Sequence, residues 1–321
     1  MLYFYARLYL TNKYSTRIVA NTAGKPEANM QKEHLPIYQI QDFEALSQKE
    51  RYFYFSSFAT HLEEHQFIRE PHKHDFYIIM IVTKGTGNHT IDFREYEVKP
   101  GTVFFMTPGQ VHSWDLSADA DGYVIFFTHG FYSRQYPDRV LYDYPFFNAL
   151  LSTPVLRLSG DDEQLLRPVL LRLQQEYEDD KPMRGVMLSR YLDILMIELT
   201  RLFQPSESIA GGTGRDQTLL QNLERLIDLH YKAHRPVAFY AEHLYVTPKH
   251  LNEVCKKKLG KTTKELIQQR LLLEAQRLLV HADLTSSQIA AELGYLDNAY
   301  FFRFFKKQLC CTPEQFRAMH Q

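Results

Sequence analysis

Residues 251–260 of this chain read Leu251-Asn252-Glu253-Val254-Cys255-Lys256-Lys257-Lys258-Leu259-Gly260, and residues 301–310 repeat the pattern as Phe301-Phe302-Arg303-Phe304-Phe305-Lys306-Lys307-Gln308-Leu309-Cys310. Each copy follows a short apolar segment and a tight turn, at residues 240–247 and again at residues 289–296. A helix, a turn and a second helix form a helix-turn-helix, and a repeat indicates two copies of one binding device. The sequence therefore predicts two helix-turn-helix units in tandem.

Capping signals define where the predicted helices begin. Thr247 precedes Pro248, which is the order of an N-cap hydroxyl and a proline at the first helical position. Asp297 can cap the corresponding helix of the second unit. The order Thr312-Pro313-Glu314-Gln315 is that of a capping box before a terminal helix. Each of these helices therefore has a defined start.

A single connecting helix is expected between the units, because apolar residues recur at helical spacing from Thr263 to Val280. A helix of that length is roughly 27 Å long. It would hold the later helices of the two units about one turn of DNA, roughly 34 Å, apart. Two adjacent segments of the major groove on one face of DNA would then be within reach.

Charge is unevenly distributed along the chain. Residues 218–321 hold 15 Lys and Arg against 10 Asp and Glu, whereas residues 1–217 hold 22 against 28. The near-neutral total therefore combines a basic end with an acidic remainder. This asymmetry fits a protein in which only one domain meets nucleic acid.

Residues 218–321 resemble the DNA-binding domain of the AraC/XylS family of bacterial transcription regulators. The motifs that carry the resemblance are Ile289-Ala290-Ala291-Glu292-Leu293-Gly294-Tyr295, Asp297, Tyr300-Phe301, Arg303, Phe305-Lys306-Lys307, Thr312-Pro313 and Phe316-Arg317. The chain departs from the family pattern at Phe302, where a small polar residue is usual, and at Cys310, where a glycine is usual. The first departure bears on base preference and the second on a local turn.

The resemblance implies which side chains would meet DNA. Base-facing positions would be Lys249, Asn252 and Glu253 in the first unit, and Asn298, Ala299, Phe302 and Arg303 in the second. Asn pairs bidentately with adenine, Arg pairs with guanine, Glu accepts from cytosine, and Phe or Ala can meet a thymine methyl group. Phosphate contacts would come from Lys256, Lys257, Lys306 and Lys307, for which a solvated helix face is the alternative. The apolar residues Leu251, Val254, Phe301, Phe304 and Phe305 are expected to face the core of each unit.

The pattern changes between about His34 and Thr128 to short apolar or alternating runs broken by Gly, Pro, Asn and Asp. These runs, at Phe76–Val82, His89–Phe93, Thr102–Met106 and Tyr123–Phe127, predict an antiparallel β-barrel or jelly roll. Within them, Pro71-His72-Lys73-His74-Asp75, Gly85-Thr86-Gly87, Pro100-Gly101 and Pro108-Gly109-Gln110-Val111-His112 resemble the two half-motifs of a cupin. This type of cupin serves as the sensor domain of AraC-like regulators.

The cupin resemblance raises the question of a metal. Cupin enzymes typically bind one through three histidines and a glutamate, so His72, His74 and His112 form a candidate set. Ile78 stands where the glutamate is expected, which leaves at most three ligands, and we predict no metal and no other cofactor. The preferred interpretation is an effector pocket for a sugar-like molecule, lined by His72, His74, Lys84, His112 and Trp114. Structural hydrogen bonding at a strand start is the alternative for His72 and His74.

Five segments follow from these patterns: an N-terminal arm (1–33), a cupin-like effector-sensing barrel (34–158), a helical pair (159–203), a flexible linker (204–217) and the DNA-binding domain (218–321). Within the helical pair, Leu165–Tyr177 and Val186–Phe203 have helical spacing. One face of the second helix predicts either dimerisation or packing on the barrel, and it carries Met187, Tyr191, Ile194, Leu195, Glu198 and Leu202. Gly, Ser and Pro dominate the linker.

The sequence contains no apolar run near the roughly 20 residues that a membrane-spanning helix needs. Its three cysteines, Cys255, Cys310 and Cys311, fit a reduced cytoplasm. We therefore expect an α+β multidomain protein of the cytoplasm, with a β-barrel, a helical dimerisation segment and an all-α tandem helix-turn-helix domain. It would be a homodimeric, effector-controlled transcription regulator that binds promoter DNA, with RNA polymerase as a further partner and no membrane contact.

We expect no enzymatic activity and assign no catalytic residue. Two alternatives stay open at this point. One is a metal-dependent cupin enzyme with an appended DNA-binding module, and the other is a ligand-independent regulator whose barrel only dimerises. Stoichiometric metal with turnover would favour the first, and the absence of any saturable small-molecule effect would favour the second. No Walker loop or GxGxxG motif indicates another enzyme class.

Overall fold

A computed structural model describes residues 36–43, 52–65, 70–136, 141, 144–148, 153–203 and 214–320. The predicted N-terminal arm and residues 204–213 of the predicted linker lie outside the described residues. Contacts divide the chain into two compact units, one that ends at Gln268 and one that begins at Gln269.

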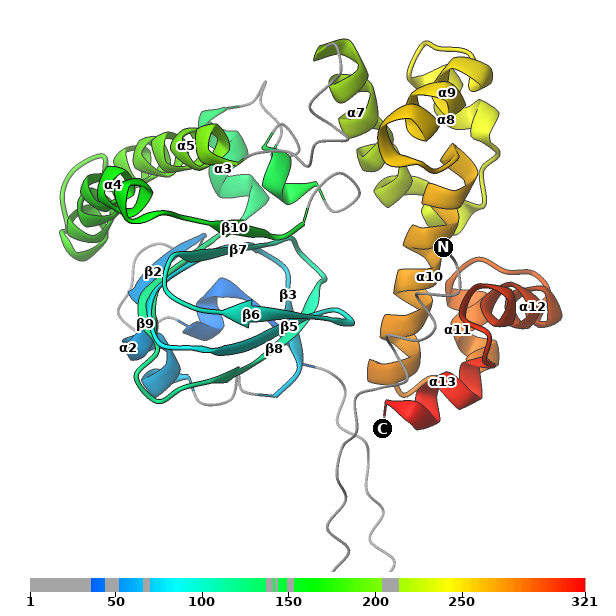
Figure 1. The fold of residues 1–321 in the computed structure, drawn as a ribbon, viewed down its shortest axis with the longest axis horizontal. Coiled ribbons are helices and arrows are strands. Elements are labelled where there is room, and N and C mark those ends of the chain that lie inside the picture. The colour runs from blue at the N-terminus through cyan, green and yellow to red at the C-terminus, as the bar shows by residue number, and fades with distance from the viewer. Residues whose placement is uncertain are drawn as a thin grey trace, which may run out of the picture. The chain divides into compact units, whose positions relative to one another are not determined.

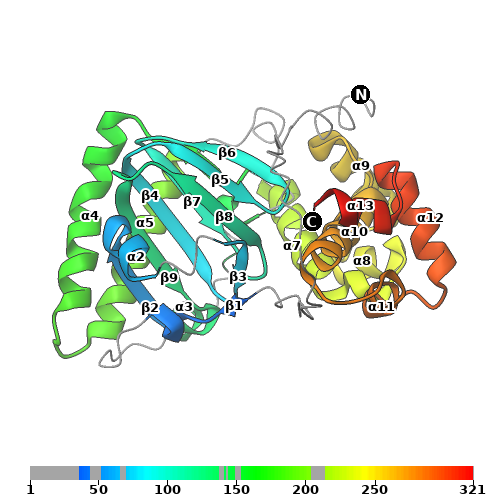
Figure 2. The same cartoon turned by 90° about the horizontal axis from the view of Figure 1, so that it is seen from below.

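Two five-stranded sheets form the barrel (Figures 1 and 2). The first sheet has the order β1 (Ile37–Tyr38), β3 (His72–His74), β8 (Val111–Leu116), β5 (Gly87–Ile91), β6 (Arg94–Val98). The second has the order β10 (Val155–Arg157), β7 (Thr102–Met106), β4 (Tyr77–Lys84), β9 (Asp121–Phe127), β2 (Phe53–Ser57). All pairs are antiparallel except β1 with β3. The barrel that the sequence predicted is confirmed.

Alternation along the central strands explains how the second sheet is buried on both faces. In β4, Ile79 and Ile81 belong to one apolar cluster, whereas Ile78 and Met80 belong to another. Successive side chains of a strand point to opposite faces, so one cluster fills the barrel and the other lies outside it. This outer cluster includes residues of the helices α4 (Gly160–Glu178) and α5 (Arg184–Leu202). The layer of α4 and α5 therefore covers the outer face of the second sheet (Figure 1).

Short helices that the sequence analysis missed complete this part of the chain. They are η1 (Ile40–Phe43), α2 (Phe58–Glu64), α3 (His129–Gln135) and η4 (Pro145–Phe147). The buried carboxylate of Asp193 in α5 accepts hydrogen bonds from the hydroxyl groups of Tyr132, 3.1 Å away in α3, and Tyr144, 2.6 Å away before η4. These bonds fasten α5 to the segments that follow the barrel.

The helical part begins with α7 (Gly214–His230), which is followed by η5 (Tyr231–Ala233). The first helix-turn-helix consists of α8 (Val237–His243) and α9 (Pro248–Leu259), and α10 (Thr263–His281) is the predicted connecting helix, continuous over 19 residues. The second consists of α11 (Ser286–Glu292) and α12 (Asn298–Leu309), followed by α13 (Pro313–Met319). Among the described residues, no helix is both long and apolar enough to cross a membrane.

The predicted caps are present. The hydroxyl of Thr247 accepts from the backbone N–H of His250 (3.1 Å), and the carboxylate of Asp297 accepts from that of Ala299 (2.8 Å). Thr312 and Gln315 form the predicted capping box. These local bonds satisfy N–H groups that have no partner inside the helix, which explains why both later helices start where the sequence indicates.

Candidate functional sites: the paired helices and the barrel interior

Helix α9 separates a buried face from an exposed one. Leu251, Val254 and Cys255 are buried, as the predicted core positions Leu251 and Val254 require, whereas Lys249 and Glu253 are exposed. Asn252 is half-buried, and its Oδ1 accepts a hydrogen bond of 3.0 Å from the backbone N–H of Thr263. Of the residues predicted to face bases in the first unit, Asn252 thus already serves the start of α10.

Helix α12 has the same division. Phe301, Phe304 and Phe305 are buried, as predicted for the core of the second unit. The predicted base-facing residues Asn298, Ala299 and Arg303 are exposed, and Phe302 is half-buried. The ring centroid of Phe302 lies 5.8 Å from that of Phe301. The half-buried ring of Phe302 is therefore followed directly in the sequence by the exposed guanidinium group of Arg303.

All four lysines that were predicted to meet phosphates are exposed. Lys256 and Lys257 lie in the last turn of α9, and Lys306 and Lys307 lie in the last turn of α12. A cation is favourable at a helix C-terminus, so the position also suits the isolated helices. Lys258, beside them in the sequence, is buried and does not share this exposed face.

The sequence analysis missed a cavity beside the first helix-turn-helix. It has a volume of about 660 Å³ and lies between α7 and the end of α8, with Arg215, Asn222, Arg225, His243 and Tyr245 among its lining residues. No local sequence signal indicates it, because the cavity depends on how α7 packs against α8. Tyr245 lies in the turn after α8 with φ +55° and is 96 % exposed.

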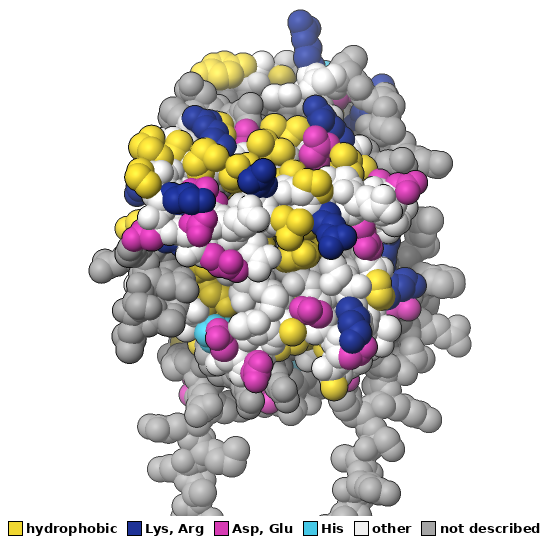
Figure 3. Space-filling model, turned by 90° about the vertical axis from the view of Figure 1, so that its left-hand side faces the viewer, with side chains coloured by type: hydrophobic (Ala, Val, Ile, Leu, Met, Phe, Trp, Pro, Cys, Tyr) yellow, Lys and Arg dark blue, Asp and Glu magenta, His cyan; other side chains and the backbone are white. Residues whose placement is uncertain are grey.

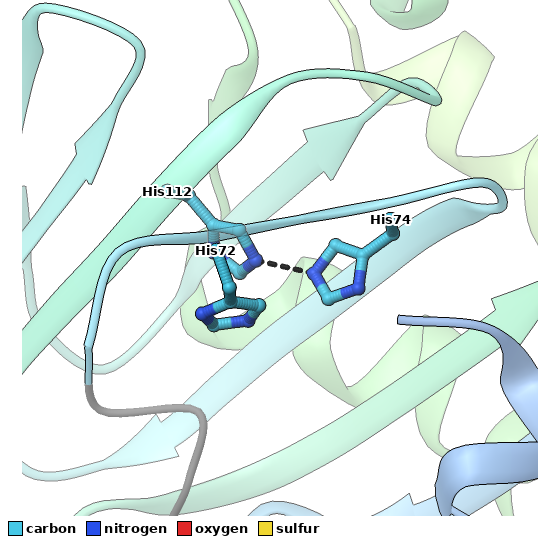
Figure 4. A group of neighbouring side chains, drawn as sticks. All are labelled: His72, His74 and His112. Carbon is cyan, nitrogen blue, oxygen red and sulfur yellow. Dashed lines mark hydrogen bonds between the residues drawn. The ribbon is translucent and has the colours of Figure 1, made fainter. Parts of the chain in front are cut away.

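Three buried histidines meet inside the barrel (Figure 4). His72 and His74 point to the same side of β3 because side chains of a strand alternate, and His72 pairs in register with His112 of β8. One ring nitrogen from each of the three residues lies within 4.8 Å of the others. Nε2 of His74 and Nε2 of His112 are 2.5 Å apart. The structure thus brings together three of the five residues predicted to line the effector pocket.

Burial keeps these imidazoles neutral. It lowers the pKa of His72 to about 4, although the bond to the Glu70 carbonyl acts in the opposite direction. The pKa values of His74 and His112 lie well below the ordinary value, first because of burial and then because of the neighbouring histidines. Each ring therefore carries one N–H and one lone pair near neutral pH.

A fourth histidine, His89 of β5, was not predicted. It is fully buried, and its Nε2 lies 3.1 Å from Nδ1 of His112. Its ring centroid lies 4.2 Å from that of Trp114, which is its partner in the register of β5 and β8. Period-two alternation in β5 would have placed His89 on the inner face with Ile91, but only the pairing of strands brings it to His112.

Of the two remaining predicted pocket residues, Trp114 joins the cluster and Lys84 does not. The ring centroid of Trp114 lies 4.6 Å from that of His112. Lys84 is exposed at the end of β4, and its Nζ lies 3.7 Å from a carboxylate oxygen of Asp119. An irregularity at the end of the strand explains this, because the pairing of β4 with β9 shifts register between Val82 and Lys84. Lys84, two residues after the buried Val82, therefore does not face the interior of the barrel.

Several polar atoms of the barrel interior have no hydrogen-bond partner among the described residues. They are Nε2 of His72, Nδ1 of His74, Nδ1 of His89 and Nε1 of Trp114. An unpaired buried polar atom costs about 1–3 kcal/mol. The presence of four such nitrogen atoms in the barrel indicates that its interior is suited to a polar ligand or an ion.

Both parts of the chain match known families. Residues 240–319 match the family described as a helix-turn-helix domain, and residues 54–139 match the family described as an AraC-like ligand binding domain. The chain is 25% identical over 255 residues to the HTH-type transcriptional activator RhaR of Escherichia coli (strain K12). The aligned region covers 78% of this chain and 87% of that relative. It is also 25% identical over 248 residues to the RhaR of Cronobacter sakazakii, covering 77% and 86%.

Two solved structures are similar to this chain over different shares of its length. ToxT from Vibrio cholerae with a bound unsaturated fatty acid covers 85% of this chain and 98% of its own, at 14% identity and a TM-score of 0.39. The C-terminal domain of the response regulator yesN from Fusobacterium nucleatum covers 30% of this chain and 93% of its own, at 27% identity and a TM-score of 0.29.

Proposed function

The chain belongs to the AraC family of transcription regulators, with an AraC-like ligand binding domain before a helix-turn-helix domain, and we propose how it acts. Members of such a family bind DNA in a sequence-specific way and respond to an effector. In our proposal, α9 and α12 each read one segment of the major groove, and the state of the barrel controls how two copies of the chain present these helices.

The single observation that carries the DNA proposal is the burial pattern shared by α9 and α12. In each helix one face is buried in the core. The opposite face is exposed and carries most of the predicted reading residues, namely Lys249, Glu253, Asn298, Ala299 and Arg303. The helix between the units, α10, has 19 residues, which corresponds to about 28 Å of helix. That length supports contacts of α9 and α12 with two segments of the major groove about one DNA turn, roughly 34 Å, apart.

The chemistry of the exposed faces assigns different roles to the two helices. Arg303 would pair with guanine and Asn298 with adenine, while Phe302 and Ala299 would meet thymine methyl groups. In α9, Glu253 would accept from cytosine, and Lys249 would donate to guanine. Because Oδ1 of Asn252 is bonded to Thr263, this residue would offer DNA only its amide N–H groups. Lys256, Lys257, Lys306 and Lys307 would contact phosphates.

The effector is proposed to bind in the barrel, beside Trp114 and the histidines. The unpartnered nitrogens of His72, His89 and Trp114 support a ligand rich in hydroxyl groups, because such groups both donate and accept. The indole ring of Trp114, which is half-buried, would give an apolar face on which a sugar ring can lie. Lys84, which pairs with Asp119 on the surface, is left out of this proposed pocket.

Dimerisation is proposed through the layer of α4 and α5. Large apolar side chains are exposed there, namely Leu165, Leu171, Met183, Met187 and Ile194. Figure 3 views this side of the molecule, where hydrophobic side chains gather among lysines and arginines. Leu195, which the sequence analysis placed on the same face, instead lies in the core. Exposed apolar residues on one face suit a second copy of the chain, because a two-fold axis lets the same face meet itself.

The dimer can be tested by sedimentation of the full-length protein. Ile194→Lys is expected to shift the chain towards the monomer. The matched control is Leu229→Lys, at an exposed leucine of α7, which should leave the dimer intact. A dimer that survives the first change and is lost with the second would place the interface elsewhere.

We further propose that the chain performs no catalysis, that it acts in the cytoplasm and that RNA polymerase is a partner at the promoter. The experiment that tests the DNA-binding role selects bound sequences from a random DNA pool with the full-length protein at near-physiological salt. Two submotifs with centres about 10 base pairs apart are expected. Binding that is blind to sequence would contradict the proposal.

The selected DNA then serves as the probe for the effector. A panel of monosaccharides is screened for a saturable change in DNA affinity, with Trp114→Ala as the variant that should lose the response. No response to any sugar, together with normal DNA selection, would overturn the sugar proposal and favour a barrel that only dimerises.

A further inference from the structure

The arrangement of the inner histidines goes beyond a polar lining. We propose that His72, His74 and His112 form a site for one divalent transition-metal ion such as Zn²⁺, that His89 orients His112 within it, and that the fourth ligand position stays open. The metal site lies in the same barrel interior as the proposed effector pocket but does not depend on an organic effector.

The hydrogen bond of His72 determines which of its ring nitrogens can bind a metal. Nδ1 of His72 lies 2.7 Å from the carbonyl oxygen of Glu70, and a carbonyl oxygen can only accept. Nδ1 therefore carries the proton, and Nε2 carries the lone pair. This Nε2 is buried and has no hydrogen-bond partner among the described residues. Histidines that bind a metal through one ring nitrogen usually donate the N–H of the other ring nitrogen to an acceptor such as a backbone carbonyl.

His89 has the corresponding role for His112. If Nδ1 of His112 donates to Nε2 of His89, 3.1 Å away, then Nε2 of His112 carries its lone pair towards Nε2 of His74. All three ligand atoms of the site would then be Nε2 atoms. Because His89 is held between the rings of Phe104 and Trp114, its own orientation is restricted. His89 is thus a positioning residue rather than a ligand.

The donor set decides which ions are favoured. Three neutral imidazoles suit Zn²⁺, Cu²⁺, Ni²⁺ or Fe²⁺, whereas Mg²⁺ and Ca²⁺ require oxygen ligands. The usual fourth protein ligand of a cupin is replaced by Ile78, which is buried at 1 % exposure and offers no donor atom. Three histidines with one open position are also a known ligand set of zinc sites that bind water or substrate. An oxygen of a small-molecule effector could occupy this position.

Binding requires the three rings to adjust their positions. For tetrahedral coordination with Zn–N bonds of about 2.0–2.1 Å, two ligand nitrogens lie about 3.3 Å apart. The Nε2 atoms of His74 and His112 are 2.5 Å apart, so these two rings must separate slightly. The ligand atoms of the whole set lie within 4.8 Å of one another, so any pair near that limit must approach.

The test uses the full-length protein after treatment with a chelator and dialysis. Zn²⁺ is titrated by calorimetry, and Co²⁺ is titrated by its visible absorption, which reports coordination number and nitrogen ligation. We expect one ion per chain. His112→Asn should abolish stoichiometric binding, and His129→Asn, which changes an exposed histidine of α3, should leave both the affinity and the spectrum unchanged.

His89→Gln separates positioning from ligation. It should weaken binding by about 10–100-fold and keep the same Co²⁺ spectrum, since the three ligands remain. Circular dichroism of each metal-free variant identifies any that fails to fold, and His72→Asn serves as the second ligand variant. The proposal is overturned if the folded wild type binds no stoichiometric ion, or if binding survives in both ligand variants. Selection of DNA sequences by the metal-free protein is a separate readout, so either proposal can fail without the other.

Discussion

The two helix-turn-helix units share a scaffold and differ in what they present to the outside. Positions 251, 254 and 255 of α9 and positions 301, 304 and 305 of α12 are all buried, and the residues between them are exposed to matching degrees. The helix that follows each unit, α10 or α13, starts with the same capping arrangement, Thr262 with Glu265 and Thr312 with Gln315. Packing and capping therefore constrain the scaffold, whereas the reading surface is free to change.

The turns show where the scaffold itself tolerates change. Tyr245 follows α8 with φ +55°, and Gly294 follows α11 with φ +80°. The backbone N–H groups in both turns make equivalent bonds, from Tyr245 to the Glu242 carbonyl and from Gly294 to the Ala291 carbonyl. The second unit then has Leu296 as an additional residue before its N-cap. One turn thus carries a bulky residue in a left-handed conformation that the other leaves to glycine.

The largest difference between the units is expected in their cores. Phe305 is fully buried, and its ring centroid lies 5.9 Å from that of Phe301 and 5.6 Å from that of Phe316. Phe305→Ala should cost about 3–5 kcal/mol of local stability. The equivalent change, Cys255→Ala, removes one sulfur atom and should cost about 1 kcal/mol. Hydrogen exchange of the full-length protein, read on α11–α13 and on α8–α9, measures both. Equal losses of stability would contradict the predicted difference between the two cores.

The turn should respond next. Gly294→Ala places a Cβ at a left-handed φ and is expected to destabilise the second unit by about 1–2 kcal/mol. Tyr245→Ala should be nearly neutral, because that position already holds a Cβ and the tyrosine ring is exposed. Urea unfolding of the two variants gives the comparison. A neutral Gly294→Ala would mean that the turn can change its conformation.

A smaller effect is expected at Asn252, which has no polar counterpart in α12. Asn252→Ala removes the acceptor for the N–H of Thr263 at the start of α10 and should cost about 0.5–2 kcal/mol. The control is Asn298→Ala, at an exposed position of α12, which should change stability by less than about 0.5 kcal/mol. If Asn252→Ala leaves stability unchanged but weakens DNA binding, the residue acts as a reader and not as a cap.

The smallest change concerns the lysines that both units share. Lys306→Ala should lower the slope of log affinity against log salt by about 0.9 and weaken binding to all sequences alike. The control is Lys181→Ala, between α4 and α5, where the ammonium group pairs with Asp179. Fluorescence anisotropy with one DNA probe at several salt concentrations is sufficient. A slope equal to that of the wild type would remove Lys306 from the phosphate contacts.

Sequence patterns were sufficient where the determinants are local. Thr247, Asp297 and Thr312 cap their helices as predicted, because an N-cap bond spans only two or three residues. The predicted barrel, the connecting helix and the buried positions of α9 and α12 follow from periodicity and are likewise confirmed. The second role of Asn252 could not be predicted, since its partner Thr263 lies in another helix and depends on how the two pack.

Long-range strand pairing limits what could be predicted inside the barrel. His72, His74 and His112 were grouped because of a motif, and the register of β3 with β8 brings them together. His89 was missed because its relation to His112 arises only from the pairing of β5 with β8. Lys84 was included because it follows a buried strand, but a shift in register leaves it on the surface.

The central claim is that two equivalent scaffolds read two different base sequences. Selection from a random DNA pool, run in parallel with the wild type, Glu253→Ala and Arg303→Ala, tests it most directly. We predict that each variant loses preference at one base pair of one submotif, by about 1–3 kcal/mol, and that the two affected positions lie in different submotifs. Loss of preference in the same submotif, or an equal loss on all sequences, would contradict the claim.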